Sequence, residues 1–213
     1  MEDHRSSGIL LAVSSLPGPY GIGSLGGPAR RFVDFLAEAG QHYWQILPLV
    51  PPGDGSSPYM SPSAFAGNPY LIDLDELEQQ GLLEREEYAS LPWGDDPERV
   101  DYQALYRLRL PVLRRACDRL LSRSPAAFDR FCLLHQAWLD DYALFMALKE
   151  QYGGAPWLEW PEDIRLRRPR AMARAKKELE DDIRFWQGVQ YLFFGQWQEF
   201  KSYVNGKGIS IVG

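Results

Sequence analysis

The side chains of this chain that could do chemistry are aromatic rings set in a turn-forming segment. Residues 47–74 are rich in Pro, Gly and Ser, which excludes a continuous helix or strand, yet they carry Tyr59, Phe65 and Tyr70. A merely solvated loop has little reason to hold such rings. Their faces could stack on a flat ligand such as a sugar. The alternative is that they pack the loop onto the rest of the protein.

Groups for acid–base or metal chemistry do not accompany these rings in the sequence. Glu38, Asp73 and Asp75 are isolated carboxylates near the ends of elements, and we assign none of them as an acid or a base. No spacing among the three histidines suits a metal. These histidines are His4, His42 and His135. We therefore expect no metal and no cofactor.

The apolar runs place the aromatic segment directly after a strand. Residues 9–13 and 43–49 are continuous apolar runs, typical of strands buried on both faces of a parallel sheet. Between them, Gly27-Pro28 opens a helix and Gly40 ends it. Strand, helix and strand with short links form a right-handed parallel unit. Barrel enzymes carry their binding residues on loops at the carboxyl ends of such strands.

Most of the remaining chain has helical periodicity, which predicts a large helical region. Its last helix feeds a third strand, and a basic run within it reads as a solvated helix start balanced by acidic residues 178–182. Helices are predicted at 75–80, at 102–121, and from Ser124-Pro125 to Gly153-Gly154, and Pro111 should kink or split the second of these. A last helical stretch follows the joint at 155–161, begins with the basic run at 165–174 and continues to 204. The third strand is predicted at 209–212.

Composition limits the possible partners and the setting. The chain has 213 residues with a net charge of −6, and an acidic balance argues against nucleic acid or an anionic membrane as partner. No apolar run approaches the roughly 20 residues of a membrane span, and the first residues are polar. Cys117 and Cys132 show no metal spacing, which suggests a reducing, cytoplasmic setting. The 13% aromatic share is explained more simply by helix interfaces than by stacking platforms.

Several long motifs resemble the amylomaltases, the 4-α-glucanotransferases of glycoside hydrolase family 77. The resemblance extends from about Gly8 to Gly213. It rests on SSLPGPYGIGSLG after the first strand, HYWQILPL as the second, SSPYMSPSAFAGNPYLIDL in the loop, DYALFMALKEQYGG from Asp141 to Gly154, and FWQGVQYLFFGQW ending at Trp197.

The resemblance implies an α/β fold, a (β/α)8 (TIM) barrel with helical insertions. A closed barrel has eight strands and about 250 residues before insertions, so we expect only its first three strands here. Residues 1–74 would start the barrel and carry a substrate loop at 50–72, residues 75–168 would form a helical insertion, and residues 169–213 a barrel helix and the third strand. We therefore expect the amino-terminal part of a larger enzyme.

The activity implied is transfer of α-1,4-glucan segments between maltooligosaccharides by a retaining mechanism. Such chemistry needs a nucleophilic carboxylate and an acid–base carboxyl. In the family these lie in an RIDH-type segment, after the next strand and in an HD pair, and the sequence contains neither RIDH nor HD. We expect the catalytic carboxylates to be absent from this chain and the chain alone to be inactive.

The resemblance also assigns candidate binding residues. Tyr59, in the motif SPY, would stack on the sugar ring beside the scissile bond, and Ser57 would bond a glucose hydroxyl or merely cap its own turn. We expect Asn68 to set the turn before Pro69. Tyr102 matches a tyrosine of a second glucan site, but the position of its aromatic partner holds Asp54, which cannot stack.

The sequence leaves three alternatives for what kind of protein carries these motifs. A non-catalytic glucan-binding module is compatible with a stacking tyrosine and no catalytic carboxylates. A helical interaction protein with a residual strand–helix–strand start is opposed by the long, specific loop motif. A portion of a complete transferase is favoured, because the last residues read as a strand that belongs inside a sheet.

Overall fold

The computed structural model describes residues 5–53, 57–94, 96, 98–123 and 125–213, which form two compact units. One unit comprises Met1–Ala116 together with Leu192–Gly213, and the other comprises Cys117–Tyr191. The expected subdomains, 1–74, 75–168 and 169–213, divide the chain at other residues, and their boundaries stay a prediction.

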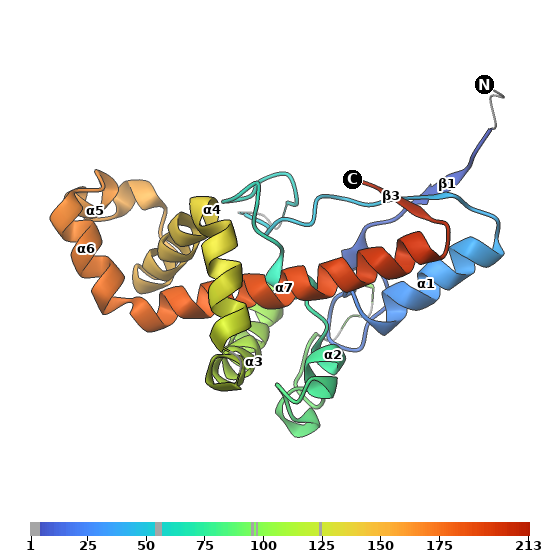
Figure 1. The fold of residues 1–213 in the computed structure, drawn as a ribbon, viewed down its shortest axis with the longest axis horizontal. Helices are drawn as coiled ribbons and strands as arrows, with labels where there is room; N and C mark the ends of the chain where they lie inside the picture. Colours follow the sequence, from blue (N-terminus) through green and yellow to red (C-terminus); the bar gives the residue numbers. More distant parts are fainter. Residues whose placement is uncertain (1–4, 54–56, 95, 97, 124) are drawn as a thin grey trace. The chain divides into compact units, whose positions relative to one another are not determined.

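A parallel three-stranded sheet lies in the first unit (Figure 1). Its strands are β1 (Gly8–Leu10), β2 (Tyr43–Gln45) and β3 (Ser210–Val212), in the order β1-β2-β3. Ile9 lies opposite Trp44, which in turn lies opposite Ile211. This arrangement confirms a mixed α/β fold that begins with parallel strands; it is part of a barrel rather than a closed one.

The helix α1 (Gly27–Glu38) joins β1 to β2 and ends as its sequence predicts. Pro28 lies in its first turn, where a missing N–H costs nothing. Gly40 has a φ of +66°, a left-handed conformation that glycine adopts without strain. The helix therefore stops where the second strand must begin.

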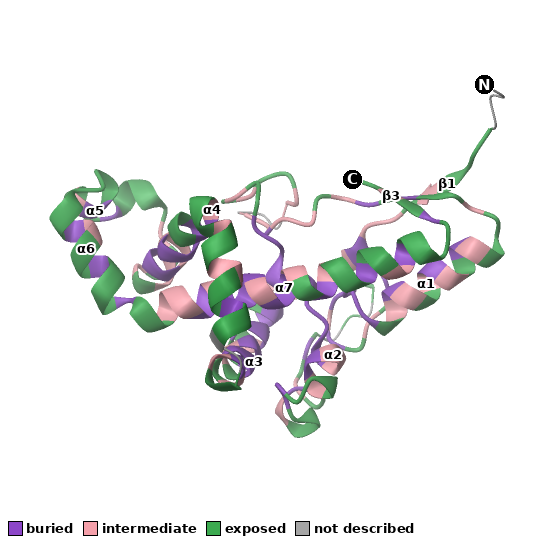
Figure 2. Ribbon diagram, in the orientation of Figure 1, coloured by how far each residue is buried: buried purple, intermediate pink, exposed green. Residues whose placement is uncertain are grey.

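Helices cover one face of the sheet at Trp44, which is fully buried. Its ring meets Phe32 of α1 edge-on at 5.0 Å and Phe200 at 6.0 Å, and its Nε1 donates to the carbonyl oxygen of Leu11 at 2.8 Å. Within residues 1–213 the strands are not buried on both faces, because Leu10 of β1 is 60% exposed and β3 is also largely exposed (Figure 2). The expectation of burial on both faces concerns a complete parallel sheet and stays a prediction.

The remaining helices follow the predicted periodicity closely. Pro111 does not split its helix, because the flanking Val112 and Leu113 are buried and tertiary packing outweighs one lost backbone hydrogen bond. No helix of the described residues is long and apolar enough to cross a membrane. The helices are α2 (Leu74–Gln79), α3 (Tyr102–Arg123), α4 (Pro125–Gln151), α5 (Glu162–Arg165), α6 (Pro169–Glu178) and α7 (Glu180–Gly206), with short 3₁₀ turns η1 (Val13–Ser15), η3 (Pro69–Leu71), η4 (Arg85–Glu87) and η5 (Trp157–Glu159).

The loop after β2 is tied at its base and at its exit. At the base, the N–H of Asn68 donates to the carbonyl oxygen of Leu49 at 2.8 Å. At the exit, the carboxylate of Asp73 accepts from the Ser24 hydroxyl at 2.6 Å. The buried amide of Gln196, on α7, accepts from the N–H of Asp73 at 2.7 Å and donates to its carbonyl at 3.0 Å. Both ends of the loop are therefore fixed, while none of residues 57–65 is buried.

A fully buried arginine joins the same exit to the loop that follows β1. Arg109 of α3 donates from its guanidinium to the carbonyl oxygen of Tyr20 at 3.2 Å and to that of Ile72 at 2.5 Å. Its guanidinium also lies 5.7 Å from the ring centroid of Trp93. Burial lowers the pKa of Arg109 to about 10, so it stays charged at neutral pH. One side chain thus satisfies two buried carbonyls from two loops.

The close approach at Gly67 generates a stability prediction. A Cβ on Gly67 would overlap the buried ring of Phe193 on α7, so Gly67→Ala should lower the free energy of unfolding by about 1–3 kcal/mol. The matched control is Gly195→Ala, an exposed position in α7 where a Cβ meets nothing, which should raise stability by about 0.5–1 kcal/mol. Urea unfolding of the two variants checks the opposite signs, and equal shifts would contradict the packing shown here.

The buried guanidinium generates a second prediction. Arg109→Met leaves the carbonyls of Tyr20 and Ile72 without their donor, and should lower the free energy of unfolding by about 2–4 kcal/mol. Arg107→Met, two residues earlier on the exposed side of α3, should change it by less than about 0.5 kcal/mol. Thermal unfolding of both variants is the measurement. A loss at Arg109 no larger than at Arg107 would show that the two carbonyls do not depend on this donor.

Candidate functional site

The loop after β2 presents large apolar side chains to solvent instead of packing them. Tyr59 is 73% exposed and Phe65 is 68% exposed, and Met60 between them is exposed as well. Tyr70, at the anchored end of the loop, is partly buried. Exposed rings of this size, gathered on one segment, are typical of a surface that binds something.

The serines of the loop cap its own backbone. Ser57 Oγ accepts from the N–H of Tyr59 at 3.3 Å. Ser63 Oγ accepts from the N–H groups of both Phe65 and Ala66 at 3.1 Å. These turns satisfy backbone donors without burying the loop, so the Tyr59 ring is presented by a locally ordered backbone. The geometry at Ser57 matches the turn alternative, and its hydroxyl can still donate to a ligand; its contact with a sugar stays a prediction.

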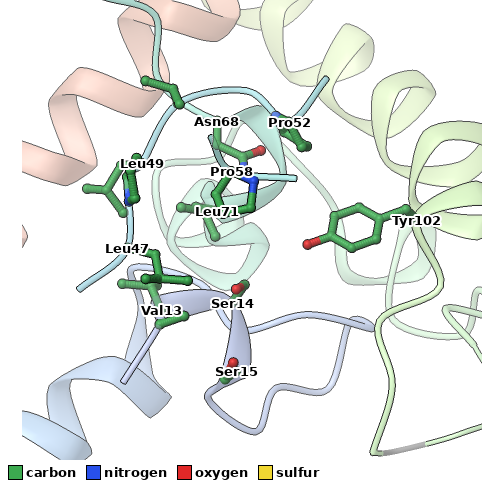
Figure 3. Close-up of a pocket in the computed structure, with 13 residues that line it drawn as sticks. Val13, Ser14, Ser15, Leu47, Leu49, Pro52, Pro58, Asn68, Leu71 and Tyr102 are labelled. Carbon is green, nitrogen blue, oxygen red and sulfur yellow. The ribbon is translucent and has the colours of Figure 1, made fainter. Parts of the chain in front are cut away.

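A cavity of about 220 Å³ lies beside the anchored part of the loop (Figure 3). Apolar walls come from Val13, Leu49 and Leu71 together with the prolines of the loop. The polar groups at the cavity come from four positions on three separate segments. These are Ser14, Ser15, Asn68 and Tyr102.

Asn68 and Tyr102 have distinct surroundings in this cavity. Asn68 Oδ1 accepts from the N–H of Tyr70 at 2.9 Å, which confirms that its side chain sets the turn before Pro69. Tyr102 begins α3 and directs its phenol into the cavity (Figure 3). Its ring meets that of Tyr70 edge-on at 6.1 Å. Burial raises the pKa of Tyr102, and raises that of Tyr70 to about 12. Both phenols therefore remain protonated, and Tyr102 can donate a hydrogen bond into the cavity.

Tyr102 also lines a larger cleft of about 590 Å³ on the side of the loop that follows β1. Pro17 and Trp93 form apolar parts of its wall, and Asp96 and Arg99 supply charges. Tyr102 therefore lines both the cavity and the cleft, which lie in the same unit. Its expected aromatic partner position, Asp54, lies outside the described residues, so the second glucan site stays a prediction.

Asp73, Asp75 and His135 have structural environments, and His4 lies outside the described residues. Asp73 caps α2, and Asp75 accepts from the phenols of Tyr20 at 2.5 Å and Tyr88 at 2.9 Å. The ring of His135 lies among aromatic rings of α4. None of the residues lining the 220 Å³ cavity is acidic or a histidine, and the described residues contain no cluster of His, Cys, Asp or Glu that could hold a metal. This cavity can bind a neutral ligand but offers no acid or base.

The basic run has other partners than the acidic residues 178–182 expected for it. Arg167 pairs with Asp141 at 2.7 Å and Arg174 with Asp163 at 3.1 Å. Asp163 lies in α5, just before the basic run, whereas Asp141 lies in α4, which sequence proximity alone does not indicate.

Sequence reasoning did not single out Ser14, Ser15 or Arg109 as parts of the site. A signal existed for the two serines, since they directly follow β1 and parallel strands end at a common edge of the sheet. A signal also existed for Arg109, which lies four residues after Leu105 and three before Val112 and so on the buried face of α3, although this spacing does not reveal the two loops that it joins.

Known proteins match this chain over nearly its whole length. Residues 11–213 match glycoside hydrolase family 77, described as 4-alpha-glucanotransferase. The 4-alpha-glucanotransferase of Clostridium butyricum is 46% identical over 201 residues, which cover 94% of this chain and 41% of that protein. The enzyme of the same name from Thermus thermophilus is 46% identical over 217 residues, covering 100% of this chain and 42% of that protein.

The solved structure of amylomaltase from Streptococcus agalactiae, in complex with acarbose, has the same fold. It superposes with a TM-score of 0.94 at 42% sequence identity, and the match covers 99% of this chain and 43% of that chain. The chain therefore spans about two-fifths of the length of the relatives it matches. Family match, sequence identity and superposition agree over almost all of its residues, and on this ground the chain belongs to glycoside hydrolase family 77, the 4-alpha-glucanotransferases.

Proposed function

We propose that this chain is the donor-binding, amino-terminal portion of a 4-α-glucanotransferase that acts on maltooligosaccharides. The observation that carries the proposal is the family loop motif, which here presents Tyr59 to solvent on a backbone anchored at both ends. A nearby amylomaltase structure is in complex with acarbose, which supports an oligosaccharide as the ligand. Neither nucleic acid nor a membrane is a partner in this proposal, and the setting is cytoplasmic.

The chain's own residues bind and orient the donor sugar. The face of Tyr59 offers apolar area to the C–H face of a glucose ring, and its phenol one hydrogen bond. Pro58 restricts the backbone before it, which lowers the entropy lost when the ligand binds. Ser57 bonds a hydroxyl of the adjoining glucose ring. Tyr102, at the cavity beside the loop, serves a second glucan contact.

The bond-making groups belong to the part of the enzyme outside this chain. A carboxylate attacks the anomeric carbon, the glycosidic C–O bond breaks, and a carboxylic acid protonates the leaving oxygen. The 4-hydroxyl of an acceptor sugar then attacks the anomeric carbon of the glycosyl-enzyme, the bond to the nucleophilic carboxylate breaks, and the hydroxyl proton passes to the residue that had protonated the leaving oxygen. The family motifs that hold these groups are missing from the sequence.

A non-catalytic glucan-binding module is the second candidate. It is favoured by one observation, the absence of acidic side chains from the lining of the 220 Å³ cavity. The two candidates differ in whether the complete protein that carries this chain converts maltotriose.

The first functional prediction concerns residues 1–213 alone. They should release no glucose from maltotriose above the rate of a buffer control, because the nucleophile and the acid are not among them. The complete protein that carries the chain should convert maltotriose to glucose and longer oligomers. Chromatography of the products distinguishes the outcomes. Transfer by residues 1–213 would refute the proposal that the catalytic groups lie outside this chain. No transfer by the complete protein would favour the binding module.

The second functional prediction concerns the Tyr59 ring. In the complete protein, Tyr59→Ala should lower kcat/KM for maltotriose by roughly 10- to 100-fold, the loss expected from about 1.5–3 kcal/mol of stacking area. Tyr59→Phe keeps the ring, and its kcat/KM should fall less than that of Tyr59→Ala. Met60→Ala, at the exposed neighbouring position, is the matched control, and its kcat/KM should stay close to that of the unchanged protein. Equal losses at both positions would mean that loop order, and not the ring, matters.

A further inference from the structure

A separate apolar cleft lies within the unit Cys117–Tyr191. Its volume is about 380 Å³, and it is formed where the second half of α4 faces η5, α5 and the start of α6. Its floor is apolar, its wall carries a tryptophan, and two guanidiniums stand at its rim. These residues are Leu144, Leu148, Ile164, Trp157, Arg165 and Arg167.

Trp157 is a half-exposed ring on a rigid support. It is 50% exposed, whereas Trp160, three residues later, is almost fully buried. The Trp160 ring packs 5.4 Å from that of Phe145 and 5.5 Å from that of Tyr152, and its Nε1 donates to the carbonyl oxygen of Ala155 at 3.1 Å. The packing of Trp160 therefore fixes the turn that carries Trp157, and the Trp157 ring would lose little conformational entropy when a ligand binds.

Arg167 occupies the rim in a conformation that costs free energy. Its φ is +51°, the left-handed region, and no other residue except glycine has a positive φ in the described part of the chain. Such a conformation costs about 1–2 kcal/mol for a residue with a Cβ. The conformation belongs to the end of α5, where the N–H of Arg167 donates to the carbonyl oxygen of Ile164 and that of Arg168 to the carbonyl oxygen of Asp163. This turn carries Arg167, which lines the cleft.

The charged and polar groups at the rim indicate which kind of ligand the cleft would bind. Arg167 Nη2 donates to Asp141 Oδ1 at 2.7 Å, so its charge is already compensated, and Asp141 would repel an anion. Arg165 Nη1 donates to the carbonyl oxygen of Leu158 at 3.1 Å, which holds its guanidinium at the cleft. The rim thus combines fixed donors with a carboxylate acceptor above an aromatic wall and an apolar floor. A ligand with one C–H face and a hydroxyl edge fits these donors, the carboxylate acceptor and the aromatic wall together.

We propose that this cleft binds an α-1,4-glucan chain, with Trp157 stacking on one glucose ring and Arg167 with Asp141 bonding its hydroxyls. The proposal rests on the proposed function, since it takes the ligand to be the glucan on which the enzyme acts. It places a glucan-holding site in the helical unit, apart from Tyr59 and Tyr102 in the sequence and in a different compact unit.

Calorimetry with β-cyclodextrin, a ring of α-1,4-linked glucose without chain ends, tests the proposal on the complete protein. A Tyr59→Ala background removes the loop's stacking ring, and binding should persist there. Adding Trp157→Ala should weaken it at least tenfold. Adding Leu158→Ala instead, an exposed neighbour that does not line the cleft, should change it less than twofold. No binding in the Tyr59→Ala background, or equal effects of the two additions, would overturn the proposal.

Arg167→Gly separates a binding role from a structural one. Glycine accepts the positive φ, so the melting temperature should stay equal or rise, while cyclodextrin binding in the Tyr59→Ala background should weaken severalfold. A lower melting temperature with unchanged binding would make Arg167 a structural residue and remove it from the site. Binding of octanoate that displaces cyclodextrin from the cleft, or replaces it there, would identify an anionic amphiphile and reject the glucan.

The two proposals fail independently. Conversion of maltotriose by the unchanged protein decides the proposed function and does not involve the cleft variants. Cyclodextrin binding in the Tyr59→Ala background decides the cleft, whether or not the protein transfers glucan.

Discussion

The carboxylate of Asp73 and the amide of Gln196 fix the point at which the loop after β2 returns to the core. Asp73 accepts from Ser24 and caps α2, while Gln196 on α7 bonds both backbone groups of the same residue. The bonded groups are buried, so no water competes for them. Because the loop's exit is held by a helix near the end of the chain, the site depends on contacts between residues more than a hundred positions apart. Arg109 adds a third tie, between this exit and the loop after β1.

Between its anchors, the loop is ordered by short-range hydrogen bonds rather than by packing. Serine hydroxyls satisfy its backbone donors, and its rings are left to solvent. This division has a physical advantage, since a ring that is not packed against the protein can bury its face on a ligand. The backbone around the ring is already ordered in the free protein, so less conformational entropy is lost when a ligand binds. Neutral hydroxyl, amide and phenol groups line the adjoining cavity, which suits a polyol ligand.

The helical unit uses the same device at Trp157. There the support is aromatic packing of Trp160 instead of serine turns, and the polar partners are an ion pair instead of hydroxyls. In our two proposals the ligand of both stacking rings is a glucan, which presents many equivalent glucose rings.

The sequence by itself determined the local elements and the family. Its helical periods predicted α1, α3, α4 and α7, its Pro, Gly and Ser content predicted the loop, and its long motifs identified glycoside hydrolase family 77, because backbone preference and motif are both local properties. Only the tertiary structure decided that Leu10 is exposed, that Pro111 leaves α3 intact, that Arg109 is buried between two loops, and that Ser14 shares a cavity with Tyr102. It also decided how far each ring is exposed, since Tyr59 and Tyr70 lie in one motif but Tyr59 is exposed and Tyr70 is partly buried. These outcomes depend on distant contacts, whose free energy no local pattern of residues records.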